Sequence, residues 1–247
     1  MARLKDQPKI GIITQARMTS TRLPGKVMLI AGGKTLLDHH IERLQKTGYE
    51  VAIATTVNTE DDIIEDFARS RAIPFFRGSE HDVLGRFHGL NAQCAYDIMV
   101  RVTSDCPLID GSLITEGIEK YLASDDDYTY VSNCFPRSYA RGFDFEIFSR
   151  TMLEEAFSLT NDPVDREHVT PFFWKNKTGN YRQINISQKV NHGDMRITVD
   201  TEDDFKLMQL LIEKYHADSL NYLQIEMLLE QHPELVAINA HIEQKKN

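Results

Sequence analysis

A short basic segment near the start of the chain contains the first residues with an evident chemical use. Arg17, Arg22 and Lys26 fall within ten residues, and no acidic residue occurs between Asp6 and Asp38. Arginine and lysine neutralise phosphate charge, while hydroxyl and backbone N–H groups hold phosphate oxygens. The segment therefore predicts a triphosphate-binding loop, and a solvated basic loop is the open alternative.

Two aspartates follow segments that we expect to be strands. Asp105 comes after the apolar run 98–103, and Asp200 comes after the run 195–199. Mg²⁺ usually takes one or two protein carboxylates together with substrate phosphate oxygens. The pair therefore predicts a Mg²⁺ site facing the basic loop, although either aspartate alone fits a turn or a helix cap equally well.

The first half of the chain alternates short β-branched runs with helical patterns. The predicted strands cover 10–14, 51–55, 73–76 and 98–103, and the predicted helices cover 36–47, 59–71, 79–96 and 113–122. This alternation predicts an α/β fold with a mostly parallel sheet covered on both faces. Ligands of such sheets bind beyond the carboxyl ends of the strands, where the basic loop begins.

The second half of the chain is less regular. Its predicted strands cover 131–132, 143–148, 181–186 and 195–199, and its predicted helices cover 152–157, 167–175 and 201–215. We interpret residues 1–247 as a single domain. It has an inserted, more antiparallel subregion near 128–190 and a C-terminal helical tail over 216–247, broken at His232-Pro233.

Composition excludes several classes of protein. The 247 residues include 28 Lys and Arg against 37 Asp and Glu, giving a net charge of −9, so a general nucleic-acid binder is not expected. The 3 cysteines favour reduced thiols over a disulfide framework. Because no apolar stretch is long enough for a membrane span, we expect a cytoplasmic protein that does not bind membranes.

The run 13–26, ITQARMTSTRLPGK, resembles the opening signature of the cytidylyltransferase family. It is most similar to the spore coat polysaccharide biosynthesis type, which is related to the CMP-ketodeoxyoctonate and acylneuraminate synthetases. Further matching motifs follow in order: GSEHDVL at 78–84, RVTSDCPLID at 101–110, RGFDFE at 141–146, REHVTP at 166–171 and TVDTED at 198–203. The resemblance implies a Rossmann-like sheet of the nucleotide-diphospho-sugar transferase type and a homodimer formed through the inserted subregion.

The resemblance also implies roles for particular residues. Arg17, Arg22 and Lys26 would be catalytic and would contact the phosphates of CTP, with Lys26 at the α-phosphate. Asp105 and Asp200 would bind Mg²⁺. The other expected nucleotide-binding residues are Gln15, Ala16, Ser20, Thr21, Ser79, Asp82 and Thr103. Of these, Ser79 and Asp82 also fit a helix capping box.

For the acceptor, we expect binding by Arg141, Asp144, Glu146, Arg166 and His168. Arginine suits the bidentate capture of a carboxylate or phosphate. His168 has an ordinary pKa of about 6.5, which suits a general base, but a helix position at a subunit interface is the alternative. The related synthetases have a Gln-Gly-Asp type of turn where this chain has Thr-Ser-Asp, so the acceptor does not transfer by resemblance.

These expectations together predict a Mg²⁺-dependent enzyme that transfers CMP from CTP to an acidic sugar or related acceptor and releases pyrophosphate. Such a reaction would serve surface polysaccharide or glycoconjugate biosynthesis. The alternatives are a nucleotide-sugar glycosyltransferase and a non-catalytic protein that binds sugar nucleotides.

Overall fold

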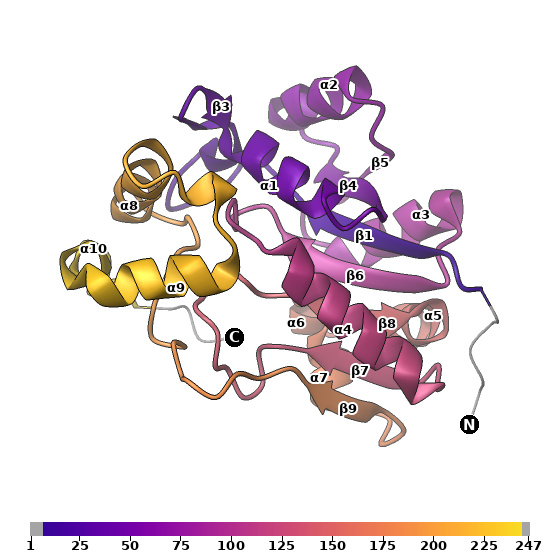
Figure 1. The fold of residues 1–247 in the computed structure, drawn as a ribbon. Helices are drawn as coiled ribbons and strands as arrows, with labels where there is room; N and C mark the ends of the chain where they lie inside the picture. Colours follow the sequence, from indigo (N-terminus) through magenta and orange to yellow (C-terminus); the bar gives the residue numbers. More distant parts are fainter. Residues whose placement is uncertain (1–6, 244–247) are drawn as a thin grey trace.

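The computed structural model describes residues 7–243 and contains a sheet of seven strands in the order β5-β4-β1-β6-β8-β7-β9 (Figure 1). The four strands β5, β4, β1 and β6 run parallel to one another, and β8 runs antiparallel to β6. The sheet strands are β1 (Ile10–Gln15), β4 (Glu50–Thr56), β5 (Phe75–Gly78), β6 (Ile98–Thr103), β7 (Thr129–Ser132), β8 (Glu146–Ser149) and β9 (Arg182–Asn185). The predicted α/β fold with a mostly parallel sheet is confirmed.

Helices cover both faces of the sheet, which explains why its central strands are apolar on both sides. Ile12 and Ile13 are adjacent in β1, yet they belong to different buried clusters because successive strand side chains point to opposite faces. The longer helices are α1 (Leu36–Gln45), α2 (Asp62–Ser70), α3 (Val83–Cys94), α4 (Gly111–Ser124), α5 (Arg150–Leu159), α8 (Glu202–Glu213) and α9 (Tyr222–Gln231). Residues of α1, α2 and α4 pack in the cluster with Ile12, whereas residues of α3 and α5 pack in the cluster with Ile13.

The remaining elements are short. They are the hairpin β2 (Ile30–Ala31) and β3 (Lys34–Thr35), the helices α6 (Pro163–His168), α7 (Pro171–Trp174) and α10 (Pro233–Ala237), and the 3₁₀ turns η1 (Lys26–Met28), η2 (Thr59–Asp61) and η3 (Ala217–Ser219). The hairpin and the turns are absent from the sequence prediction. None of the helices within residues 7–243 has both the length and the apolar character needed to cross a membrane.

The predicted inserted subregion does not form a separate layer. Strands β8, β7 and β9 extend the parallel strands as one continuous sheet, with β9 at its edge. The single helix predicted over 167–175 is wrong, because the chain breaks it into α6 and α7. Val169 separates the two at a φ of 67°, and Pro171 begins the second helix.

The strand predicted over 195–199 is also wrong. Its extended residues make only an isolated bridge between Arg141 and Arg196, and they cross the end of the sheet instead of joining it. The N–H of Val199 donates to the carbonyl of Asp105 at 2.8 Å, which carries the following residue, Asp200, to the end of β6. The helix predicted from residue 79 begins later, at Val83, with Asp82 as its N-cap.

Candidate active site

A cavity of about 350 Å³ opens beyond the carboxyl ends of β1 and β6. Predicted site residues from distant parts of the sequence line it together: Gln15, Ala16, Arg17, Ser20, Thr21, Arg22, Lys26, Thr103, Asp105, Arg141, Asp144, His168 and Asp200. The end of a parallel sheet thus brings the basic loop and both predicted metal aspartates to one cavity, as the sequence predicts.

The basic loop is held in shape by contacts at both ends. Gly25 has a φ of 70°, a conformation that glycine adopts without strain, and its N–H donates to the carbonyl of Met18 at 2.8 Å. The N–H of Met18 donates to the buried carboxylate of Asp61 at 2.6 Å. Glu80 accepts from the hydroxyl of Thr19 at 2.5 Å and from Arg17 at 3.0 Å. The loop is therefore a fixed structure, and two carboxylates from outside it set its position.

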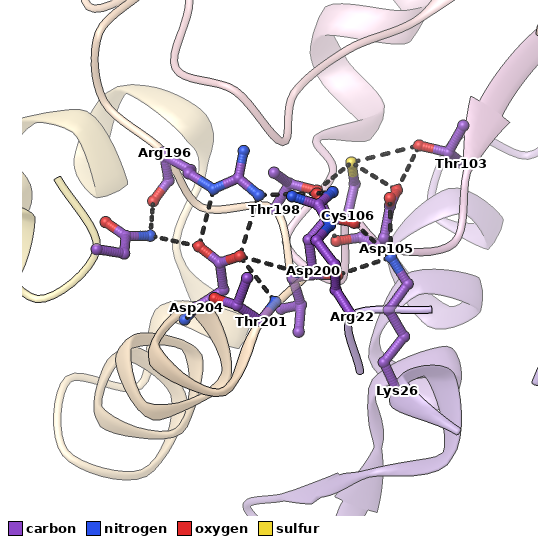
Figure 2. A network of polar contacts seen from close by, with 12 residues as sticks. Arg22, Lys26, Thr103, Asp105, Cys106, Arg196, Thr198, Asp200, Thr201 and Asp204 are labelled. Atoms are coloured by element: carbon purple, nitrogen blue, oxygen red, sulfur yellow. Dashed lines mark hydrogen bonds and ion pairs between the residues drawn. The ribbon is translucent and has the colours of Figure 1, made fainter. Parts of the chain in front are cut away.

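Lys26 joins Asp105 and Asp200 in the polar network shown in Figure 2. Its Nζ is 2.8 Å from Asp200 Oδ1 and 3.1 Å from Asp105 Oδ2, and it donates to the carbonyl of Val199 at 2.8 Å. The chain folds this way because η1 begins at Lys26 immediately after the Gly25 turn. One lysine from the first loop thus joins two aspartates that lie 79 and 174 residues away along the chain.

Asp200 contacts two further cations. Its Oδ2 is 2.9 Å from a guanidinium nitrogen of Arg22 and 2.7 Å from one of Arg196. Arg196 in turn pairs with Asp204, which also caps the first turn of α8 through a capping box with Thr201 (Figure 2). Asp200 is therefore fixed by Arg22 of the basic loop and by Arg196. Arg196 is itself held by Asp204 in the first turn of α8.

The charges in this network shift the pKa values of its members. Burial alone would lower the pKa of Lys26, but the carboxylates of Asp105 and Asp200 outweigh burial and raise it. Burial opposes ionisation of Asp105, yet the ammonium of Lys26 and the hydroxyl of Thr103 lower its pKa to about 2. At neutral pH the lysine is an ammonium ion, and Asp105 is a carboxylate.

A second cavity, of about 540 Å³, adjoins the first and shares Arg101, Thr103, Arg141, Asp144 and His168 with it. Its acids are already paired. Glu146 contacts Arg101 and the hydroxyl of Tyr130, and both oxygens of Asp144 contact Arg137. The side chains of Asp144 and Glu146 therefore hold arginines in this structure.

Arg141 differs from these paired arginines. Its guanidinium makes no hydrogen bond or ion pair with residues 7–243, although it lines both cavities. Burial and the nearby charge of Arg137 lower the pKa of Arg141. A guanidinium in this setting is available for an anionic ligand.

His168 lines both cavities from the end of α6. The next residue, Val169, is fully buried, and its φ of 67° is a strained conformation for a β-branched side chain. The strained turn closes with a hydrogen bond from Thr170 N–H to the carbonyl of His168 at 2.8 Å. Burial lowers the pKa of His168, so its imidazole is neutral at pH 7.

A model of the cytidylyltransferase family matches residues 11–242. The chain belongs to this family. A spore coat polysaccharide biosynthesis protein of Bacillus subtilis, SpsF, is 30% identical over 211 residues, which cover 82% of this chain and 85% of the relative. The match confirms the family that the opening signature resembles.

Solved structures support the same assignment. A cytidylyltransferase from Leptospira borgpetersenii superposes with a TM-score of 0.89 at 31% identity, over 97% of this chain and 100% of that one. A CMP:2-keto-3-deoxy-manno-octonic acid synthetase complexed with CTP superposes with a TM-score of 0.61 at 17% identity, over 84% and 99%. The second likeness shows that this chain has the fold of a CTP-binding synthetase.

Three predicted site residues lie outside the lining of both cavities: Ser79, Asp82 and Arg166. Asp82 caps α3 by accepting from Gly85 N–H at 2.8 Å. Arg166 donates to the carbonyls of Thr160 and Phe157 at 3.0 Å and stacks over the Phe157 ring. In this member of the cytidylyltransferase family the structure therefore places Asp82 and Arg166 in helix packing and does not bring them to the cavities.

The structure also adds two arginines that the sequence analysis missed, Arg86 and Arg101. Arg86 lies on the buried side of α3, and burial together with the charge of Arg17 lowers its pKa to about 10. Helical periodicity predicts that Arg86 is buried, because residues 83, 86, 87 and 90 share one face of a helix. Arg101 also has a signal in the sequence, because it is a charged residue within the mostly apolar strand β6.

Proposed function

We propose that this protein transfers CMP from CTP to an acidic sugar or related acceptor and releases pyrophosphate. The observation that carries the proposal is the meeting of Lys26 with Asp105 and Asp200 at one cavity beside the basic loop. Phosphoryl chemistry depends mainly on positioning and on charge stabilisation, and this cavity offers both. The similarity to SpsF of Bacillus subtilis supports a role in polysaccharide biosynthesis.

In the proposed reaction the cavity of about 350 Å³ holds CTP. A hydroxyl oxygen of the acceptor attacks the α-phosphorus, and the bond from that phosphorus to the oxygen bridging to the β-phosphate breaks. Arg17, Arg22 and Lys26 stabilise the charge on the phosphates as pyrophosphate leaves. Gln15, Ala16 and Thr103 form walls for the nucleoside, while Ser20 and Thr21 offer hydroxyls to phosphate oxygens.

The adjoining cavity of about 540 Å³ is the proposed acceptor site. Arg141 would bind the anionic group of the acceptor, because it is the lining arginine without an acidic partner in the described chain. Phe135 and Trp174 stack with ring centroids 4.9 Å apart on the same lining and would contact an apolar face of the acceptor. The neutral imidazole of His168 would accept the proton of the attacking hydroxyl.

Asp105 and Asp200 fit a divalent metal. Both direct a carboxylate oxygen at one cation, the Nζ of Lys26, and carboxylate oxygens are the donors that Mg²⁺ prefers. These two residues would hold Mg²⁺, and the bound ion would supply positive charge to the phosphate oxygens.

Thermal-shift measurements with Mg²⁺ and CTP, ATP, GTP or UTP test the nucleotide preference, because a ligand of the native state raises its apparent stability. We expect stabilisation by CTP. Pyrophosphate release across a panel of acidic sugars and phosphorylated acceptors then tests transfer. Lys26→Ala and Asp105→Ala should abolish release, whereas Lys34→Ala, which removes a surface pair with Glu42, should not.

The alternatives have their own signatures in these experiments. A glycosyltransferase would be stabilised by a sugar nucleotide and would not consume free CTP. A non-catalytic binding protein would be stabilised by CTP but would release no pyrophosphate with any acceptor. The homodimer stays a prediction, which light scattering of the purified protein tests.

A further inference from the structure

The ammonium of Lys26 has no donor left for a substrate in this structure. An ammonium group has three N–H donors, and those of Lys26 face Asp200, Asp105 and the carbonyl of Val199 at 2.8, 3.1 and 2.8 Å. A phosphate oxygen can bind this ammonium only after it leaves at least one of its present partners. The role proposed above for Lys26 therefore requires a change of partners.

The two carboxylates have supports that do not depend on Lys26. Asp105 Oδ1 accepts from the hydroxyl of Thr103 at 2.5 Å. Asp200 Oδ2 contacts Arg22 at 2.9 Å and Arg196 at 2.7 Å. The other oxygen of each carboxylate faces Lys26 (Figure 2). If the ammonium left, these two oxygens would stay close to each other and would lack a cation.

The same two oxygens are the ones that a divalent metal would take. A metal bound to both would lie within a few ångströms of the present position of Nζ, and two cations that close repel each other strongly in a buried site. The site is buried enough for this repulsion to matter, since the side chains of Lys26, Asp105 and Asp200 are 11%, 25% and 13% exposed.

Lys26 can leave without movement of the backbone. Its Cα is fixed by the Gly25 turn and by the hydrogen bond from Leu29 N–H to its carbonyl at 3.2 Å. The charged group, however, ends a flexible four-carbon side chain. Arg17, Arg22 and the hydroxyls of Ser20 and Thr21 line the same cavity, so phosphates bound there would lie within its reach.

We infer that Lys26 is the internal counter-ion of the metal site and competes with the divalent ion for Asp105 and Asp200. The metal and the nucleotide then bind cooperatively, because the phosphates of the nucleotide receive the ammonium that the metal displaces. Metal alone binds weakly, since it must displace an ammonium from both of its present carboxylate partners. The identity of the nucleotide in this inference rests on the proposed function. The competition between Lys26 and the metal does not.

Binding of Mn²⁺ in the absence of nucleotide tests the inference directly. The electron paramagnetic resonance signal of free Mn²⁺ reports binding to the purified full-length protein without any turnover. We expect Lys26→Met to bind Mn²⁺ about tenfold more tightly than the wild type, a typical size for coupling between two ligands. Lys26→Gln, which retains hydrogen-bond donors but no charge, should also bind more tightly. The matched control is Lys34→Met, which removes an ammonium 2.6 Å from a surface glutamate and should leave Mn²⁺ binding unchanged.

A second measurement completes the thermodynamic cycle. Adding CTP should tighten Mn²⁺ binding to the wild type by a larger factor than it tightens binding to Lys26→Met. Equal or weaker Mn²⁺ binding by both Lys26 variants without nucleotide would overturn the inference, and so would tighter binding by Lys34→Met. If CTP proves not to be the nucleotide, the proposed function fails, while the nucleotide-free comparison still decides whether Lys26 competes with the metal. Should Lys26→Met not fold, Lys26→Gln carries the comparison.

Discussion

The guanidinium of Arg196 holds both carboxylate oxygens of Asp204, with Nε 2.8 Å from Oδ1 and a terminal nitrogen 3.0 Å from Oδ2. The same guanidinium reaches Asp200 at 2.7 Å. Because Asp204 is also the N3 residue of the α8 capping box, the pair connects a helix terminus to a proposed metal ligand. Arg196 is therefore one of the groups that hold Asp200 at the end of the sheet, where no strand of the described chain positions it.

Removing this arginine should destabilise the protein strongly. Arg196→Ala leaves the fully buried carboxylate of Asp204 without its cation, and breaking a buried ion pair typically costs about 3 kcal/mol or more. Urea unfolding measures the loss. The control is Lys206→Ala, because Lys206 pairs with Asp203 on the surface and its removal should change the free energy of unfolding by less than about 0.5 kcal/mol. Similar losses in both variants would contradict the assigned role of Arg196.

Arg141 should affect the acceptor more than the nucleotide. We expect Arg141→Ala to raise the KM for the acceptor about 30-fold. This corresponds to the loss of about 2 kcal/mol of binding free energy, a typical contribution of a hydrogen bond to a charged group. The stabilisation of the protein by CTP should be retained. Steady-state kinetics with the best acceptor of the panel measures the effect, and Arg182→Ala, an exposed arginine on β9, is the control. If CTP binding were lost instead, Arg141 would belong to the nucleotide side of the site.

Glu80 should matter for nucleotide binding although it lies outside the basic loop. It accepts from Arg17 and from Thr19, and it also accepts from Asn58 at 2.8 Å, so its removal frees one side of the loop. We expect Glu80→Ala to weaken CTP binding about tenfold, or about 1.4 kcal/mol. Isothermal titration calorimetry measures the change, with the exposed Glu60→Ala as the control. Tighter binding would mean that Glu80 restrains Arg17 instead of positioning it.

The stability of the protein should depend on the charge of His192. Burial opposes protonation of its ring, but contacts with Glu230 at 2.8 Å and Glu226 at 2.7 Å outweigh burial and raise the pKa of His192. A raised pKa means that the stabilisation is complete below the ordinary histidine pKa of about 6.5 and is lost as the pH rises through the folded-state value.

Urea midpoints at about pH 6 and about pH 9 test this prediction, because they lie on either side of the titration. The wild type should be less stable at the higher pH, and His192→Gln should lose most of this difference. His232→Gln is the control, since the ion pair of His232 is with the exposed Glu234 at the helix break. An unchanged pH dependence in His192→Gln would assign the effect to other groups.

Much of the fold was predictable because its first half consists of regular units. The strand over 98–103 and the order of strands and helices through α4 follow from β-branched runs and helical periodicity. The basic loop and Asp105 were predictable for the same reason, since a parallel sheet places the ends of adjacent strands together. Here local sequence and overall fold agree.

The failures lie where tertiary contacts decide the local structure. The run 195–199 has the composition of a strand, but its backbone pairs with the N–H and carbonyl of Arg141 and with the carbonyl of Asp105, two residues outside the strands of the sheet. It therefore crosses the sheet end without joining a strand. The break at Val169 depends on a strained conformation that no propensity predicts. Glu146 lines the second cavity, and the sequence could not show that Arg101 and Tyr130 contact both of its carboxylate oxygens.

The contact of Asn239 with this network bears on the order in which the network can form during synthesis. Asn239 follows α10 and donates to the carbonyl of Arg196 at 3.1 Å and to Asp204 at 2.8 Å. The network around Asp200 therefore joins Arg22, in the basic loop, to a residue that the ribosome adds much later. A nascent chain can build the parallel strands during synthesis, but it completes this network only after residue 239 has emerged.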